Sequence, residues 1–223
     1  MHNKAAVQSQ RTRSKARPAR RARTVPQEEQ RFYSPPEDWY EPTSAGGKDY
    51  RIVVQPPGEG YRHVVTPQQI RRRLAKLPPA MLQPLDVVQL SGMTRKKSLY
   101  PLYGMQWGST LYLYPIEEGL VEYFPRKPGP AFFNEARSYG GRWMQHGEEW
   151  ECHWTASTIR NYYLNNILLH ELGHLLDNRN TTYTDRERYA EWFATHYGDK
   201  SPERKKLAAR GAKKLVRRRH HSA

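Results

Sequence analysis

The run His170-Glu171-Leu172-Gly173-His174 contains three ionisable side chains, those of His170, Glu171 and His174, at a spacing that suits metal chemistry. On a helix, residues four apart lie on the same face, so both imidazoles can reach one ion. Neutral imidazole nitrogens suit Zn²⁺, which they bind at about 2.0–2.1 Å in a tetrahedral shell. Glu171 lies beside that face, where it can take a proton from a water held by the metal and pass it to a leaving amine. This HExxH motif therefore predicts a zinc cofactor held by His170 and His174, with Glu171 as general base.

The same motif has a purely structural interpretation, in which both histidines are satisfied by hydrogen bonds inside a buried helix. The neighbouring Leu168, Leu169 and Leu172 suit a packed core, so the motif would place three ionisable groups within it. Burying such groups without a purpose is costly. The apolar surroundings therefore favour the metal site.

A catalytic zinc needs a third protein ligand and one open position. An HExxH-x-x-G-x-x-H extension would place Gly at 177 and His at 180, but the chain has Asp177 and Asn180 there. The next predicted helix instead contains the run Glu187-Arg188-Tyr189-Ala190-Glu191-Trp192-Phe193-Ala194. The third ligand is therefore expected from that helix.

The chain resembles the gluzincin metallopeptidases, because HELGH is followed by the pattern E-x-x-A-acidic-x-F-A. This pattern is most similar to that of the ImmA/IrrE-like and lethal-factor-like branches. The resemblance implies that Glu187 is the third zinc ligand, Ala190 the small residue against the HExxH helix, and Glu191 a carboxylate that orients a ligand histidine. The pattern E-x-F-A also resembles aminopeptidase-type gluzincins, which would make Glu191 the ligand. Glu187 fits better because Ala and an acid follow it at +3 and +4, although Thr184-x-x-Glu187 would also suit a capping box.

Further residues near the motif have two interpretations each. Asp177, three residues after His174, is either the end of the helix or an acceptor for a ligand histidine. A donor that stabilises the oxyanion is also needed opposite the metal. Candidates for it on the second helix, each also suited to ordinary packing or surface positions, are Tyr183, Tyr189, His196 and Tyr197.

Two helices must position these groups. Thr155 or Ser157 can cap the first, and apolar residues recur almost all round it until Asp177, which indicates a buried helix. Thr184 can cap the second, which is predicted over 185–197.

A sheet is predicted upstream of these helices, with a short helix over 67–76. The β-rich runs are 50–55, 85–90, 109–114 and 150–154, whereas Pro and Gly clusters predict mostly loop over 124–148. Ser109–Tyr114 resembles the edge strand on which zincins pair an extended substrate, but it also suits an ordinary core strand.

The net charge of +15 lies in the two ends of the chain. Residues 1–31 carry nine basic and two acidic residues, and 200–223 carry ten and one, whereas 32–199 carry 18 and 19. We expect a disordered basic tail over 1–31, a Pro/Gly-rich arm over 32–48, a folded domain over 49–199 and a basic helix or tail over 200–223. The ends would suit salt-sensitive attachment to nucleic acid or another acidic surface, or simply solubility.

Composition also bears on location. The single cysteine, Cys152, cannot form an intrachain disulfide, and a reducing compartment is the default. No apolar run is long enough for a signal peptide or a membrane span, so a cytoplasmic location is expected. The first 27 residues, which are Arg-rich and acid-free, would also suit an organellar transit peptide.

Together these features predict an α+β, zincin-like domain, in which a small mixed or antiparallel sheet packs on a buried HExxH helix and a second ligand helix. The expected function is that of a zinc metallopeptidase acting on a protein or peptide. The alternative is a nucleic-acid-associated protein whose zincin-like domain is regulatory or inactive.

Overall fold

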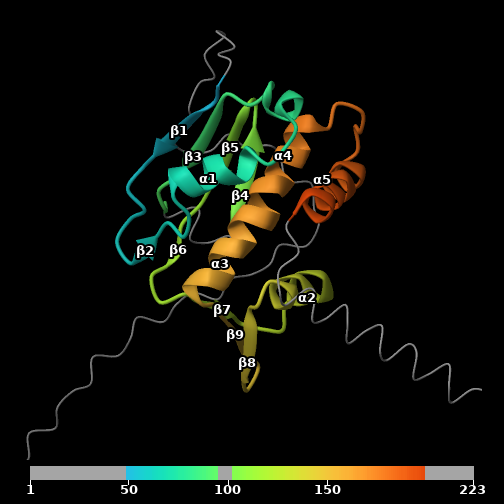
Figure 1. The fold of residues 1–223 in the computed structure, drawn as a ribbon. Coiled ribbons are helices and arrows are strands. Elements are labelled where there is room, and N and C mark those ends of the chain that lie inside the picture. The colour runs from blue at the N-terminus through green and yellow to red at the C-terminus, as the bar shows by residue number, and fades with distance from the viewer. Residues whose placement is uncertain (1–48, 95–101, 199–223) are drawn as a thin grey trace, which may run out of the picture.

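The structure is a computed structural model that describes residues 49–94 and 102–198. These residues form a mixed α+β fold, as expected, with small sheets and five α-helices (Figure 1). The predicted basic tails, the Pro/Gly-rich arm and the helix within 200–223 lie outside the described residues. Within the described ranges, no helix is long and apolar enough to cross a membrane.

The main sheet has four strands, in the order β1-β3-β5-β4. β1 (Arg51–Val54), β3 (Val87–Leu90) and β5 (Thr110–Leu113) run parallel, and β4 (Gly104–Trp107) pairs antiparallel with β5. All residues of β3 and β5 are buried, which is typical of central strands covered on both faces. Of the two interpretations of 109–114, the ordinary core strand is confirmed and the edge strand is wrong, because β5 is internal and β4 lies at the edge.

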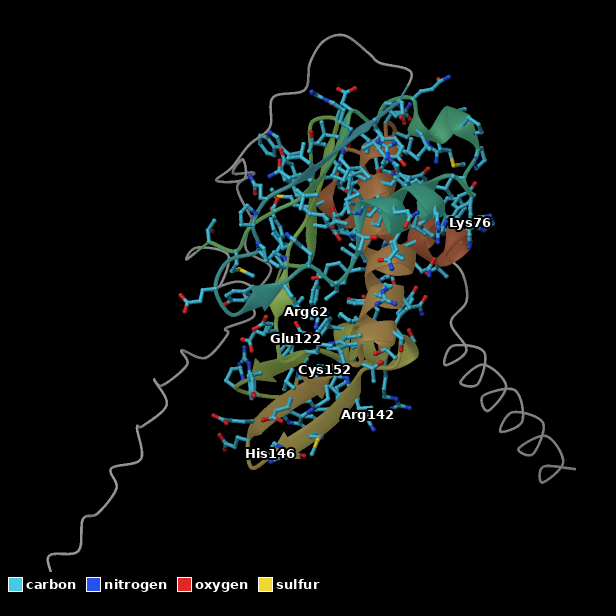
Figure 2. All side chains as sticks on the ribbon, turned by 60° about the vertical axis from the view of Figure 1, so that its left-hand side comes forward. Arg62, Lys76, Glu122, Arg142, His146 and Cys152 are labelled. Carbon is cyan, nitrogen blue, oxygen red and sulfur yellow. The ribbon has the colours of Figure 1, made fainter. Side chains whose placement is uncertain are left out.

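Two smaller sheets flank the main sheet. β2 (Tyr61–Arg62) pairs with β6 (Ile116–Glu117), while β9 (Glu149–His153) lies between β7 (Val121–Phe124) and β8 (Arg142–His146). Figure 2 labels side chains on the second of these sheets, among them Glu122 and Cys152. Cys152 is a buried free thiol.

The prediction of loop over 124–148 is wrong. Pro130 begins helix α2 (Pro130–Ser138) as its first residue, where the missing N–H and the fixed φ of proline are favourable. Gly140 and Gly147 have φ of 94° and 65°, and they form the turns on either side of β8. The Pro and Gly clusters thus mark the boundaries of these elements.

The HExxH motif lies on a long helical rod that crosses one face of the main sheet (Figure 1). The rod consists of α3 (Ala156–Tyr162), a π-helical turn (Tyr163–Ile167) and α4 (Leu168–Leu176). Thr155 caps its start through a capping box with Thr158. The hydroxyl of Tyr163 donates to the carbonyl of Tyr114, at the end of β5, which ties the rod to the sheet.

Two further α-helices, α1 (Pro67–Leu74) and α5 (Tyr183–Tyr197), and a short 3-10 helix complete this layer. α1 is capped by Thr66 and lies on the same face of the sheet as the rod, and the short 3-10 helix η1 spans Pro79–Leu82. α5 packs along α4. Its cap is Thr182, whose hydroxyl accepts the N–H of Asp185 at 3.2 Å, so the expected cap at Thr184 is wrong.

Close approach of α4 and α5 depends on small residues. A Cβ on Gly173 would lie 2.9 Å from the Cα of Ala190 and 3.1 Å from the Cβ of Phe193. Ala190 is fully buried against the HExxH helix, where the gluzincin resemblance placed it. The contact brings the first half of α5 beside the histidines of α4.

Candidate metal centre

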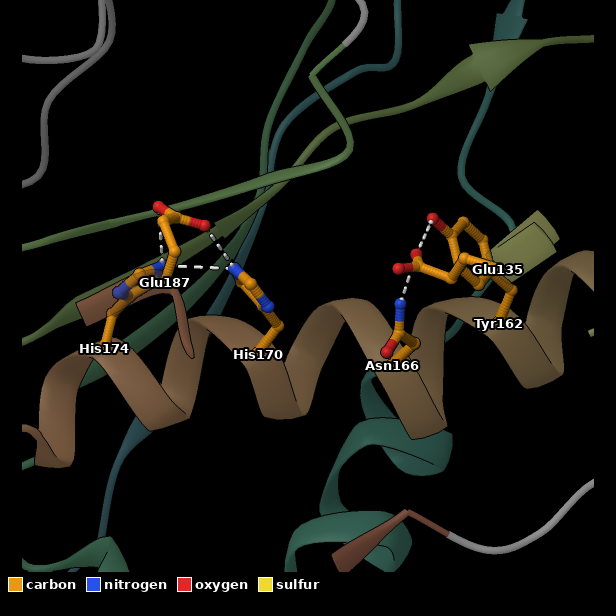
Figure 3. Close-up of polar contacts among 6 residues, drawn as sticks. All are labelled: Glu135, Tyr162, Asn166, His170, His174 and Glu187. Carbon is orange, nitrogen blue, oxygen red and sulfur yellow. Dashed lines mark hydrogen bonds and ion pairs between the residues drawn. The ribbon is translucent and has the colours of Figure 1, made fainter. Parts of the chain in front are cut away.

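Three side chains from α4 and α5 converge on one point (Figure 3). The Nε2 atoms of His170 and His174 are 3.1 Å apart. Glu187 places Oε2 3.4 Å from the Nε2 of His170 and Oε1 3.4 Å from the Nε2 of His174. The structure therefore brings Glu187 together with both histidines of the motif.

These separations suit zinc. A tetrahedral Zn²⁺ with bonds of about 2.0–2.1 Å separates each pair of its ligand atoms by about 3.3 Å. The two Nε2 atoms, 3.1 Å apart, and the 3.4 Å from each Nε2 to the nearer oxygen of Glu187 are close to that value, although the two histidines face different oxygens of this carboxylate. Two imidazoles and one carboxylate are also the protein ligands of a common type of catalytic zinc site. The donor set and its spacing fit the metal that the motif implies.

Charge is strongly coupled within the ligand set. Burial opposes ionisation of Glu187, but hydrogen bonding to His170 and His174 outweighs it and holds the pKa of this carboxyl well below its usual range. Burial would lower the pKa of His170, whereas Glu187 and neighbouring acids raise it. The carboxylate is thus kept ionised, which is the form that binds a metal.

Glu171 lies beneath the edge strand β4. Its side chain is buried, and burial raises its pKa despite the opposing effect of His170 and His174. The backbone N–H of Gln106 donates to its carboxylate. A Cβ on Gly104 would lie 2.9 Å from both Cγ and Oε1 of Glu171, so only glycine leaves this carboxylate its present space.

The other acidic candidates lie elsewhere. Glu191 is exposed on α5 and is not part of the three-residue ligand set. Asp177 is buried, and it accepts the backbone N–H groups of Arg179 and Asn180, so it closes the turn after α4. Within the described part of the chain, no residue accepts a hydrogen bond from the buried Nδ1 of His174. Neither Glu191 nor Asp177 therefore accepts a hydrogen bond from the Nδ1 of His174, although such an acceptor was expected.

The aromatic candidates for an oxyanion donor belong largely to packing. Tyr189 and Tyr197 pack against Phe193, and His196 stacks on Trp192 at a ring-centroid distance of 5.1 Å. Tyr183, in the first turn of α5, is 58% exposed.

An open pocket adjoins the C-terminal end of β4. Its volume is about 560 Å³, and its lining residues are Gln106, Trp107, Gly108, Thr181 and Arg186. Arg186 also donates to the backbone carbonyl of His174 at 3.3 Å. The pocket therefore lies close to the ligand set, between the edge strand and the start of α5.

A second carboxylate, which the sequence did not indicate, lies on the same side of the rod. Glu135 from α2 accepts hydrogen bonds from the hydroxyl of Tyr162 and the amide of Asn166, each at 2.6 Å. The spacing of Tyr162, Asn166, His170 and His174 by four was the only sequence signal for this arrangement. Glu135 itself lies in the segment predicted as loop.

No protein-family model matches the chain, and comparisons with curated proteins and with solved structures find no significant match. Its function must therefore be inferred from the site.

Proposed function

We propose that the chain is a zinc-dependent peptidase of zincin-like fold. The observation that carries this proposal is the convergence of His170, His174 and Glu187 into a group that could hold a metal ion, with a buried Glu171 beside them. The mixed sheet, with its antiparallel edge strand above the HExxH helix, supports the fold assignment.

When bound, zinc would act as a Lewis acid that polarises a water and the peptide carbonyl. The proton transfers belong to Glu171. Because burial raises its pKa, this carboxylate accepts a proton more readily than an exposed glutamate, and it can then donate that proton to the leaving amine. The N–H of Gln106 holds the carboxylate in place during both transfers.

The substrate would bind in extended form along β4. This strand lies at the edge of the sheet and contacts α4. An edge strand offers backbone groups for pairing with a peptide, and the pocket at its end can receive a side chain. The proposed substrate is therefore an unfolded segment of a protein or a peptide.

The proposal is tested with full-length protein, its zinc content and an unstructured substrate such as casein. We expect one zinc per chain, with hydrolysis that Glu171→Gln abolishes while zinc is retained. Glu191→Gln is the matched control, because it makes the same change at an exposed acid outside the ligand set.

Two results would contradict the proposal. Absence of zinc would exclude the metal site itself. Stoichiometric zinc without hydrolysis would instead favour a regulatory or inactive zincin-like domain.

A further inference from the structure

A polar stripe continues from the metal ligands along the rod. Figure 3 shows Tyr162, Asn166, His170 and His174 on one side of the helix, with Glu135 and Glu187 above it. In a continuous α-helix, the eight residues from Tyr162 to His170 would rotate about 80° beyond two full turns. The wider π-helical turn Tyr163–Ile167 takes back most of that rotation. Asn166 and Tyr162 therefore share the face of the ligand histidines.

The hydrogen bonds to Glu135 occupy only one of its oxygens. Tyr162 and Asn166 both donate to Oε1, and no described residue donates to Oε2. Within the described ranges, no Lys or Arg forms an ion pair with this carboxylate. Burial raises its pKa, and among the described residues the ionised form is offset only by these two hydrogen bonds and by the nearby His170.

Glu122 provides an internal comparison. This carboxylate, which is buried whereas Glu135 is half-buried, also accepts two side-chain hydrogen bonds, but Tyr103 donates to its Oε1 at 2.7 Å and Trp154 to its Oε2 at 2.8 Å. Both oxygens of Glu122 are thus used in joining parts of the fold. Glu135 is held by one oxygen and keeps the other for a further donor.

We propose that Oε2 of Glu135 binds a cationic group of the substrate, either a free amino terminus or a Lys or Arg side chain. The inference rests on the proposed peptidase function. Asn166 lies about 6 Å along the helix from His170, which is about two residues of an extended peptide. Glu135 therefore recognises a positive charge within about two residues of the scissile bond, and the nearby Glu191 adds to the negative potential.

The test measures binding without hydrolysis. Zinc-loaded, full-length Glu171→Gln protein is immobilised and exposed to two degenerate heptapeptide mixtures, one with free and one with acetylated amino termini. The retained peptides are sequenced by mass spectrometry. We expect about tenfold enrichment, either of free amino termini or of Lys and Arg at one position, because an ionic hydrogen bond is formed. The enriched class identifies the source of the charge.

A second substitution assigns that enrichment to Glu135. Adding Glu135→Gln keeps an acceptor oxygen for Tyr162 and Asn166 but removes the charge, so the enrichment is lost while zinc content is retained. Adding Glu191→Gln instead removes only the weaker contribution of the exposed neighbour and leaves most of the enrichment in place. Equal retention of cationic and neutral peptides by the Glu171→Gln protein overturns the proposal, as does enrichment that survives Glu135→Gln.

Failure of this inference is distinct from failure of the proposed function. Hydrolysis of casein without any preference for cationic peptides would leave the peptidase and exclude the subsite. Glu135-dependent enrichment without hydrolysis would leave the subsite and exclude the peptidase.

Discussion

Gly104 lies against the buried side chain of Glu171, and Gly104→Ala should fill part of the space that this side chain occupies. The added Cβ would lie 2.8 Å from Cγ2 of Ile167 and 2.9 Å from both Cγ and Oε1 of Glu171. Ile167 and the Cγ of Glu171 belong to a buried helical rod and cannot move aside as the end of an exposed side chain could. The substitution must therefore displace either β4 or Glu171, the proposed general base.

The cost follows from these contacts. Overpacking by one methyl group costs about 1–3 kcal/mol, whereas replacing glycine in a strand gains about 0.5–1 kcal/mol. We expect a net loss of about 1–2 kcal/mol in the free energy of unfolding. Misplacing a catalytic group by about 1 Å costs roughly 10²-fold in rate, so hydrolysis should fall by that order while zinc is retained.

Gly119→Ala is the matched control, because a Cβ there would meet nothing within 4 Å. Urea unfolding, zinc content and casein hydrolysis are measured for both variants and the wild type. The control should match the wild type or be slightly more stable. If Gly104→Ala has the stability and activity of Gly119→Ala, the assigned contact between β4 and Glu171 is refuted.

Three further predictions concern the ligands and their supports. Zinc at 1,000 times its Kd adds about 4 kcal/mol and should raise Tm by about 8–16 °C. If Glu187→Gln weakens zinc binding about 100-fold, thermal scans at the same zinc concentration should retain about 3–6 °C of that shift, whereas Glu191→Gln keeps all of it. Because burial raises the pKa of Glu135 above 4.5, its contribution to stability is present below pH 4.5 and is lost as pH rises through the folded pKa. The free energy of unfolding of Glu135→Gln, measured by urea titration, should therefore rise relative to that of the wild type between pH 4 and pH 7. If the difference between the two proteins is the same at both pH values, the raised pKa of Glu135 is refuted. Gly173→Ala should destabilise in the same assay, because a Cβ 2.9 Å from the Cα of Ala190 costs about 1–3 kcal/mol against about 1 kcal/mol of helix propensity. Equal or greater stability would contradict that packing.

Sequence alone predicted that His170, His174 and Glu187 lie together, because their positions follow local rules. His170 and His174 are one helical turn apart, and Glu187 was favoured by the small residue at +3, which does pack against α4. Thr182 rather than Thr184 caps α5, so the competing interpretation of Glu187 as part of a capping box is wrong. Local patterns did not predict the position of a strand in the sheet, because that position depends on which strands pair with it. The alternating Leu and Tyr of β5 suit an edge strand or an internal one equally, and its position depends on β4, which was not predicted.

The alignment of Glu135 with the metal ligands is a tertiary property. The π-helical turn that sets it is supported from three distant elements: Arg73 of α1 donates to the side chain of Asn165 at 2.6 Å, Tyr139 after α2 donates to its carbonyl at 3.1 Å, and Gly198 after α5 approaches that carbonyl closely. None of these contacts leaves a periodic signal in residues 163–167, so the pattern predicted an uninterrupted α-helix. In such a helix the rotation of about 80° would turn Tyr162 away from the histidines. A sequence pattern can therefore locate ligands that share one helical turn, but a carboxylate that reaches the same face from another helix depends on the contacts that widen the rod.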